Sequence, residues 1–250
     1  MIHACTPSNF CAFASCDPIY MHDHAPALAA SCALSGTNLH IHVVSASGDD
    51  IDFLLTLYER AQTLNKEVNF TFSFSTIDLS ELSAEQRRVY YSLDRFITVG
   101  EMVDEGLGAV FITDIDCLIM GSIPQLGEDI GLFIREPFNN GNPWETLGSN
   151  VAAGAVYINN TEFAKKYIKE VSEDLKTRDL RWFTDQVVLW EKYKLAMRDN
   201  QGMSCRSFGP DFMDWEFIEG TTIWTGKGPR KYDNPIYVGK KKEFAELLEM

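Results

Sequence analysis

Residues 110–120 read VFITDIDCLIM, an apolar run that two carboxylates, Asp114 and Asp116, interrupt. Such a run is typical of a strand buried on both faces, and side-chain alternation predicts that both acids point to the same side. Buried carboxylates repel each other and lose hydration unless a cation neutralises them. The stretch therefore predicts a divalent cation at the carboxyl end of a central strand, where α/β sheets bind ligands. The alternative is a turn that happens to contain two acids.

The segments around this stretch alternate between strand and helix patterns. In the first half, strands are predicted at 10–14, 39–45, 68–74 and 109–113, and helices at 25–34, 51–64 and 83–105. In the second half, strands are predicted at 130–134 and 151–158 and helices at 161–176 and 182–193, while the chain from 203 onward has no clear period. This alternation indicates βαβ units, and no linker or repeat divides the chain. The sequence therefore predicts one α/β domain over residues 1–250, with a mostly parallel central sheet flanked by helices.

Composition places the chain among folded globular proteins and argues against nucleic acid as a partner. Apolar residues make up 45% and charged residues 23% of the 250 residues, which excludes wholesale disorder. There are 36 acidic and 22 basic residues, and the net charge of -14 is unfavourable for binding a phosphate backbone. Residues 227–242 are the exception, because basic side chains greatly outnumber the single acid, Asp233. This basic cluster indicates either an anionic ligand held at one place or a solvated basic tail.

The cysteines and the N-terminus bear on the compartment. None of the 6 cysteines forms a CxxC pair, and their spacing fits neither a zinc site nor a small disulfide framework. The first residues lack the basic start and apolar core of a signal peptide. No apolar stretch approaches the roughly 20 residues that a membrane-spanning helix needs. We therefore expect a reduced, cytoplasmic protein without a membrane span.

The acidic stretch resembles the DxD motif of GT-A-fold glycosyltransferases, above all those of family 8, the glycogenin-like and galactosyltransferase-like enzymes. Four other segments are similar to family segments and occur in the same order. They are the end of the first strand with Asp17 and Tyr20, the strand at 152–159 with Gly154, the helix start at 184–189 with Asp185 and Gln186, and the pair Gly226 and Lys227. The resemblance implies a single Rossmann-like GT-A domain, with a nucleotide-binding half at about 9–120 and an acceptor- and sugar-shaping half at about 121–250.

The resemblance also implies an activity and a set of roles. The activity is metal-dependent transfer of a hexose from a nucleotide sugar, a UDP-sugar, with retention of configuration, to a hydroxyl of a glycan, a protein or another compound. Asp114 and Asp116 would hold Mn²⁺ or Mg²⁺. The contacts to the nucleotide sugar would come from Asp17, Tyr20, Arg95, Gly154, Gly226 and Lys227. The catalytic candidates are Asp185, which would position the donor sugar, and Gln186 beside the reacting face; the alternative for Asp185 is a helix cap.

Three positions depart from the family pattern. Ile223 stands where the family has a His as third metal ligand, Ala152 stands where it has an Asn, and Arg95 matches only after a shift of one residue. These departures motivate a second hypothesis, a nucleotide-sugar-binding protein that has lost transfer. A third hypothesis is a phosphatase of the haloacid dehalogenase type, which also carries a DxD after a strand. In that class a Thr would stand in place of Leu118, and the motif would lie near the N-terminus.

Three weaker signals concern metal binding and sugar stacking. His22, Asp23 and His24 could hold a metal, but an exposed turn and cap before a helix is the favoured interpretation. Trp144, in the Gly-rich loop 139–148, is the candidate on the acceptor side. A series of aromatic residues fits either sugar stacking or, more commonly, the packing of an irregular core segment; it consists of Phe208, Phe212, Trp215, Phe217 and Trp224.

Overall fold

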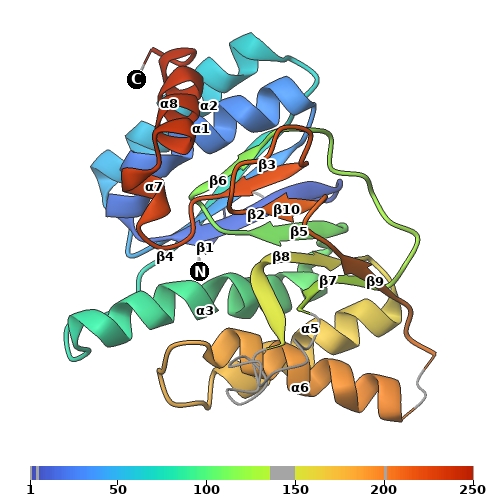
Figure 1. Ribbon diagram of the computed structural model, residues 1–250. Helices are drawn as coiled ribbons and strands as arrows, with labels where there is room; N and C mark the ends of the chain where they lie inside the picture. The colour runs from blue at the N-terminus through green and yellow to red at the C-terminus, as the bar shows by residue number, and fades with distance from the viewer. Residues whose placement is uncertain (1, 4–5, 136–149, 200–201, 250) are drawn as a thin grey trace.

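The computed structural model describes residues 2–3, 6–135, 150–199 and 202–249 of the chain. This part of the protein forms three layers, with a central β-sheet between two groups of helices (Figure 1). One face of the sheet carries α1 (Pro18–Ser35), α2 (Gly48–Leu64) and α8 (Pro235–Glu246), and the other carries α3 (Ala84–Met102), α5 (Glu162–Leu175) and α6 (Thr184–Arg198). None of these helices is both long and apolar enough to cross a membrane. The α/β arrangement predicted from the sequence is confirmed.

The central sheet has eight strands within the described ranges, and most of them run in the same direction. In spatial order they are β1 (Ile2–His3), β4 (Phe70–Ser75), β3 (Leu39–Val44), β2 (Cys11–Cys16), β5 (Val110–Thr113), β8 (Val151–Ile158), β7 (Ile130–Ile134) and β9 (Cys205–Phe208). Of these eight, β1 and β8 run antiparallel to their neighbours. Because β2 and β5 are adjacent and parallel, their carboxyl ends meet at the same edge of the sheet.

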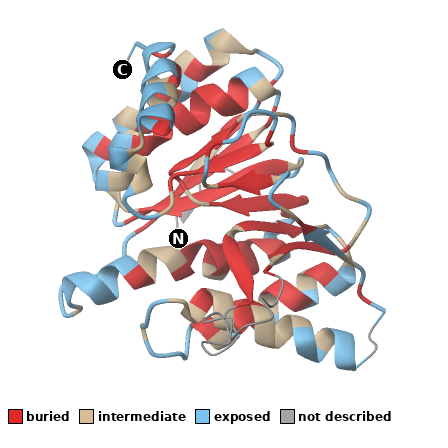
Figure 2. Ribbon diagram, viewed as in Figure 1, coloured by how far each residue is buried: buried red, intermediate tan, exposed pale blue. Residues whose placement is uncertain are grey.

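Strand β2 shows why the central strands are apolar throughout. Ala12 and Ala14 belong to the core under α1 and α2, whereas Cys11 and Phe13 belong to the core under α3. Every residue of β2 is buried, as expected for a strand covered by helices on both faces. Figure 2 shows the same pattern across the sheet, with burial concentrated in the strands and on the inward faces of the helices.

Local capping signals set where the helices begin. Asp17 caps α1 by accepting a hydrogen bond from Tyr20 N at 2.9 Å, and Pro18 opens the first turn. Helix α1 therefore begins well before the predicted start at residue 25. The exposed turn predicted at residues 22–24 is wrong, because these residues lie inside α1 and His24 is buried.

The acidic pair lies in a turn and not in a strand. β5 ends at Thr113, and a turn closed by a hydrogen bond from Cys117 N to Asp114 O at 3.1 Å leads into β6 (Cys117–Ile119). β6 leaves the central sheet and forms a second sheet with β11 (Ile223–Thr225) and β10 (Met213–Asp214). The turn between the two sheets, and not strand alternation, therefore orients the two carboxylates.

The segment after residue 203, which had no clear period, completes the fold. It contributes β9 to the central sheet and β10 and β11 to the second sheet. It then forms α7 (Arg230–Asp233) and α8, and α8 packs against α1 (Figure 1). Because β11 pairs with β6, the residues that follow β11 return to the acidic turn.

Gly100 lies where α3 crosses α5, and its lack of a side chain permits their close approach. A Cβ at this position would lie 2.4 Å from Ser172 Cβ and 3.1 Å from Ile168 O. We predict that Gly100→Ala lowers the free energy of unfolding by about 1–3 kcal/mol, because overpacking forces the helices apart. The measurement is urea unfolding, with Gly239→Ala in α8 as control.

Gly239 is also helical but has open space where a Cβ would lie. Gly239→Ala is therefore expected to raise the free energy of unfolding by about 0.5–1 kcal/mol, through the better helix propensity of Ala. Unchanged stability of Gly100→Ala would contradict the close helix crossing.

Candidate active site

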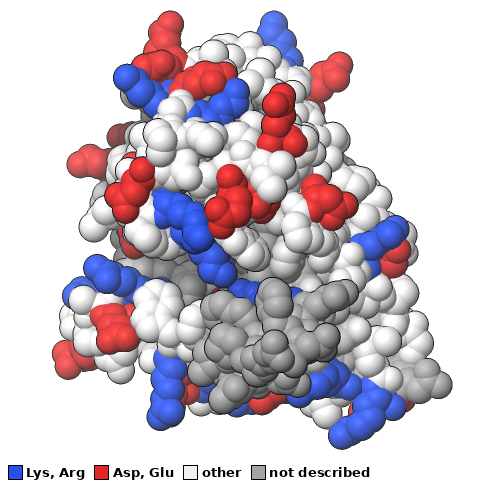
Figure 3. All heavy atoms as spheres, viewed as in Figure 1, with Lys and Arg blue, Asp and Glu red and all other residues white. Residues whose placement is uncertain are grey.

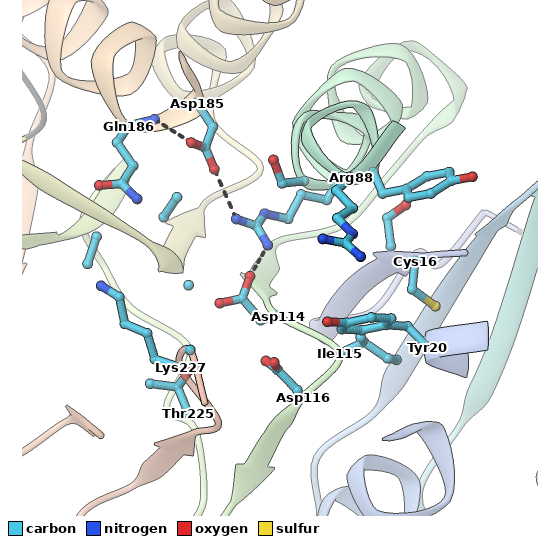
Figure 4. A pocket seen from close by; sticks show the side chains of 18 of the residues that line it. Cys16, Tyr20, Arg88, Asp114, Ile115, Asp116, Asp185, Gln186, Thr225 and Lys227 are labelled. Atoms are coloured by element: carbon cyan, nitrogen blue, oxygen red, sulfur yellow. Dashed lines mark hydrogen bonds and ion pairs between the residues drawn. The ribbon is translucent and has the colours of Figure 1, made fainter. Parts of the chain in front are cut away.

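A cavity of about 460 Å³ lies at the carboxyl ends of β2 and β5. Its walls come from both halves of the chain, and Figure 4 shows side chains from several elements pointing into it. The lining contains four carboxylates and five basic side chains, which are Asp17, Asp114, Asp116, Asp185, Arg88, Arg95, Arg135, Lys227 and Lys231. An excess of positive charge at one place in an acidic protein indicates an anionic ligand.

The backbone of the acidic turn is held from the C-terminal segment. The carbonyl oxygen of Asp116 accepts hydrogen bonds from Gly226 N at 3.0 Å and from Tyr237 Oη at 2.6 Å. The Asp116 side chain is buried, whereas that of Asp114 remains 35% exposed. Both carboxylates line the cavity, but Asp114 is partly exposed whereas Asp116 is nearly enclosed by protein.

Arg95 connects the acidic turn to α6. Its guanidinium donates to Asp114 Oδ1 and lies 3.2 Å from Asp185 Oδ2, as the dashed lines in Figure 4 mark. Burial opposes the charge of Arg95, but Asp114 and Asp185 outweigh burial and hold the pKa of the guanidinium above its usual range. Arg95 therefore lines the cavity and binds two of the other candidate residues.

Lys231 makes the matching contact with the second carboxylate. Its Nζ donates to Asp116 Oδ2 at 2.7 Å, and only 12% of the Lys231 side chain and 10% of the Asp116 side chain are exposed. The ammonium also lies 4.8 Å from the centre of the Tyr20 ring, a cation–π distance. Burial opposes its charge, but Asp116 raises the pKa of Lys231 above its usual range. In the sequence, Lys231 stands out only as one member of the basic cluster at 227–242.

Asp185 and Gln186 occupy the first turn of α6. The helix follows Phe183, whose φ of 70° is left-handed, and Asp185 Oδ1 accepts a hydrogen bond from Gln186 N at 2.9 Å. Phe183, and not Asp185, is the N-cap residue of α6; Asp185 lies one residue further in than the helix start, where it accepts from Gln186 N and contacts Arg95. Gln186 Oε1 accepts a hydrogen bond from Arg135 at 2.9 Å. Burial raises the pKa of Asp185, and Arg95 acts in the opposite direction.

The two predicted glycines make close approaches of different kinds. A Cβ at Gly154 would lie 2.6 Å from Asp114 Oδ2, so a larger residue would require this carboxylate to move. A Cβ at Gly226 would lie 2.8 Å from Lys231 Cβ and 2.9 Å from Tyr237 Oη. Gly154 thus lines the cavity, whereas Gly226 lets the chain fold back behind it.

The remaining predicted residues, Asp17, Tyr20 and Lys227, all line the cavity. In Figure 4, Lys227 and Tyr20 lie on opposite sides of the two carboxylates. Lys227 Nζ lies 5.1 Å from the centre of the Trp215 ring, and burial lowers its pKa. Arg88, on α3, also lines the cavity and was not predicted.

A divalent cation would find only part of a ligand set among the described residues. The ligand atoms of Asp114, Asp116 and Cys117 lie within 4.8 Å of one another. Burial raises the pKa of the Cys117 thiol far above its usual range, so the thiol stays protonated and is a poor ligand. Ile223, where the resemblance implied a His, is fully buried and pairs with Ile119. Because each carboxylate also contacts a protein cation, these residues do not complete a divalent site.

The weaker signals have mixed outcomes. His24 is buried, and burial lowers its pKa to about 4, so it is neutral at ordinary pH. Most of the aromatic series belongs to the core, as the commoner interpretation held, but Trp215 lines the cavity. Trp144 lies outside the described residues.

The arrangement of strands and helices is that of a GT-A domain. No family model matches the chain, and no curated protein matches its sequence. Among solved structures, the galactosyltransferase LgtC, in complex with donor and acceptor sugar analogues, is 16% identical; the match covers 96% of this chain and 95% of that one, with a TM-score of 0.57. The GT-A fold expected from the sequence is therefore confirmed.

Two longer glycosyltransferases match as well. GlyE of Streptococcus pneumoniae TIGR4 is 12% identical over 98% of this chain and 63% of its own length, with a TM-score of 0.58. The bifunctional enzyme WbbM is 11% identical over 98% of this chain and 52% of its own length, with a TM-score of 0.55. This chain thus spans about half to two thirds of these two proteins, and at such identities the likeness shows the fold alone.

A buried carboxylate lies directly behind the cavity wall. Asp94 is 2% exposed and accepts hydrogen bonds from Ser15 Oγ at 2.6 Å and from Thr98 Oγ1 at 3.2 Å. His42 Nε2 lies 3.6 Å from the same carboxylate. Burial raises the pKa of Asp94 to about 6, although Ser15 and Thr98 lower it. Ser15 lines the cavity, so this polar cluster supports the end of β2.

The raised pKa of Asp94 predicts a specific pH dependence of stability. The folded protein binds a proton that the unfolded chain releases near pH 4, so the stabilising effect is present at low pH and is lost as the pH rises to about 6. We predict that the free energy of unfolding of Asp94→Asn, which cannot ionise, rises relative to that of the unchanged protein by about 2–3 kcal/mol as the pH increases from about 4 to about 7. Free energies of unfolding at both pH values measure this gain. The control is Asp52→Asn, at an exposed position. If Asp94→Asn differs from the unchanged protein by the same free energy of unfolding at both pH values, the raised pKa of Asp94 is refuted.

Proposed function

We propose that this protein is a glycosyltransferase that takes its sugar from a nucleotide-sugar donor. The observation that carries the proposal is the set of five basic side chains around the acidic turn, in a protein with a net charge of -14. A diphosphate is strongly anionic, and fixed cations in a partly enclosed site bind it well. On the face seen in Figure 3, acidic and basic side chains are interspersed, which does not favour a nucleic acid as partner. The GT-A fold gives independent support.

The donor is proposed to be a UDP-hexose that lies across the cavity. Asp17 and Tyr20, at the start of α1, are assigned to the base, and Lys227 to the diphosphate. Gly226 was predicted to contact the diphosphate too. Because it lies close to the Cβ of Lys231, we assign it a structural role, which is to let the Lys231 backbone approach. Arg95 is assigned to the nucleotide sugar and to holding Asp114 and Asp185 in place.

The proposed reaction retains the configuration of the sugar. The bond between the anomeric carbon and the diphosphate oxygen breaks, and its electron pair stays on the diphosphate. The acceptor oxygen bonds to the anomeric carbon, and its proton passes to the leaving diphosphate. Lys227 stabilises the leaving charge, and Asp185 with Gln186 positions the sugar and stabilises its transient positive charge. The acceptor is a hydroxyl of a glycan, a protein or another compound.

The predicted Mn²⁺ or Mg²⁺ ion would be held by Asp114 and Asp116. When bound, such an ion supplies charge neutralisation of the leaving diphosphate. Because the described residues do not complete its ligand set, the roles above are assigned only to side chains of this protein.

The two alternatives differ in what supports them. A nucleotide-sugar-binding protein without turnover is favoured by Ile223 and Ala152, which replace side chains that the family uses. Sugar transfer from any nucleotide sugar that depends on Asp116 would exclude it. The phosphatase alternative gains no support from a GT-A fold, and phosphate release from p-nitrophenyl phosphate that is absent in Asp114→Asn would revive it.

Thermal unfolding with nucleotides is the direct test of the proposed ligand. At about 100 times its dissociation constant, a bound nucleotide stabilises the protein by roughly 2.7 kcal/mol, a shift of a few degrees at this size. We expect UDP to raise the unfolding temperature more than GDP does. No shift with either nucleotide, with or without Mn²⁺, would contradict the proposal.

Asp185→Asn separates the reaction from donor binding. We predict at least a roughly 100-fold loss of kcat, because the variant keeps the shape of Asp185 but lacks the charge that meets the developing positive sugar. UDP affinity should change by less than about 3-fold, since Asp185 is assigned to the sugar and not to the nucleotide. The measurements are UDP release from UDP-hexoses and calorimetry with UDP. Asp179→Asn, whose side chain is 78% exposed, is the control and should keep full turnover; equal turnover in Asp185→Asn would remove Asp185 from the mechanism.

A further inference from the structure

We propose that the Lys231 ammonium takes the place of a divalent metal ion at Asp116, so that this protein binds a nucleotide diphosphate without metal. The inference rests on the proposed function, because it specifies how the same cavity binds the diphosphate of the donor. It departs from the sequence expectation of metal dependence.

Lys231 is held firmly in this position. Its Nζ is 2.7 Å from Asp116 Oδ2 and 4.8 Å from the Tyr20 ring centre, so the ammonium lies between the acidic turn and the start of α1. Its backbone is brought close by Gly226, at which a Cβ would lie 2.8 Å from Lys231 Cβ. Tyr237, on α8, fixes the same turn by donating to Asp116 O at 2.6 Å. The pair therefore results from packing on both sides and not from a mobile surface lysine.

The ligand set around the pair favours an ammonium over a divalent ion. Asp114, the other carboxylate, is engaged by Arg95. The aliphatic Ile223 replaces the nitrogen ligand that the resemblance implied, and its side chain is buried in the second sheet. A metal at Asp116 would have to displace Lys231 and leave its ammonium without its carboxylate partner, which is costly in a partly enclosed site. Protein side chains thus already meet the charge of each acid, with Arg95 at Asp114 and Lys231 at Asp116.

Lys227 supplies a second ammonium for binding a diphosphate without metal. Lys227 lines the same cavity, beside Trp215, and Arg88 lines it from α3. A lysine ammonium is a compact charge that binds phosphate oxygens by short, charge-assisted hydrogen bonds. Lys231 and Lys227 together would meet the charge that a divalent ion otherwise neutralises.

The first test needs no variant. UDP binding is measured by calorimetry with the unchanged protein, once in EDTA and once in excess Mn²⁺. We expect dissociation constants within about 3-fold of each other, and no binding of Mn²⁺ alone by electron paramagnetic resonance. UDP binding that disappears in EDTA and returns with Mn²⁺ would overturn the inference while supporting the proposed function. No UDP or GDP binding under either condition would overturn both.

Variants then locate the effect at Lys231. Lys231→Met should weaken UDP binding in EDTA by roughly 10- to 100-fold, the range for losing a charged hydrogen bond. Because Asp116 loses its ammonium, the same variant should gain binding of Mn²⁺ in the resonance spectrum. Lys231→Arg should keep metal-free binding. The control is Lys242→Met, whose lysine is 75% exposed on α8. Unchanged UDP affinity of Lys231→Met in EDTA would overturn the inference.

Discussion

The contact of Arg95 with both Asp114 and Asp185 is the interaction on which the rest of the site depends. It joins three elements that are far apart in the sequence, namely α3, the turn after β5 and the first turn of α6. Buried carboxylates are tolerated only when a cation and hydrogen bonds meet their charge, and a buried guanidinium has the same requirement. Arg95 meets the charge of the buried Asp185 and of the partly exposed Asp114, and these two carboxylates in turn meet the charge of the buried guanidinium.

The C-terminal segment completes this arrangement from the other side. The acidic turn lies where the central sheet gives way to the second sheet, and β11 leads directly to Gly226, Lys227 and Lys231. Lys231 reaches Asp116 across 115 positions of sequence. The basic cluster seen in the sequence is thereby divided, because Lys227 and Lys231 line the cavity whereas the lysines of α8 pair with acids such as Glu243 and Glu246. The cluster is thus divided between the wall of the cavity and helix α8.

Sequence reasoning succeeded where the signal is local. The apolar runs around Phe13 and Ile112 predicted central strands, since a strand covered on both faces has no polar side. It failed where a local pattern admits two structures. The sequence predicted a helix start at residue 25, but the cap formed by Asp17 begins the helix earlier and places Pro26 inside it. Arg135 could not be recognised, because no motif surrounds it and its contact with Gln186 exists only in the folded protein.

By itself, the sequence determined the α/β class, the order of most strands and helices before residue 203, and two carboxylates at the end of a central strand. These follow from periodicity and from the cost of burying charge, both of which are local properties. The tertiary structure decided which cation meets each carboxylate, with Arg95 at Asp114 and Lys231 at Asp116. The reason is physical: an ion pair depends on the distance between atoms in space, and the pairing of β6 with β11 sets that distance independently of the spacing along the chain.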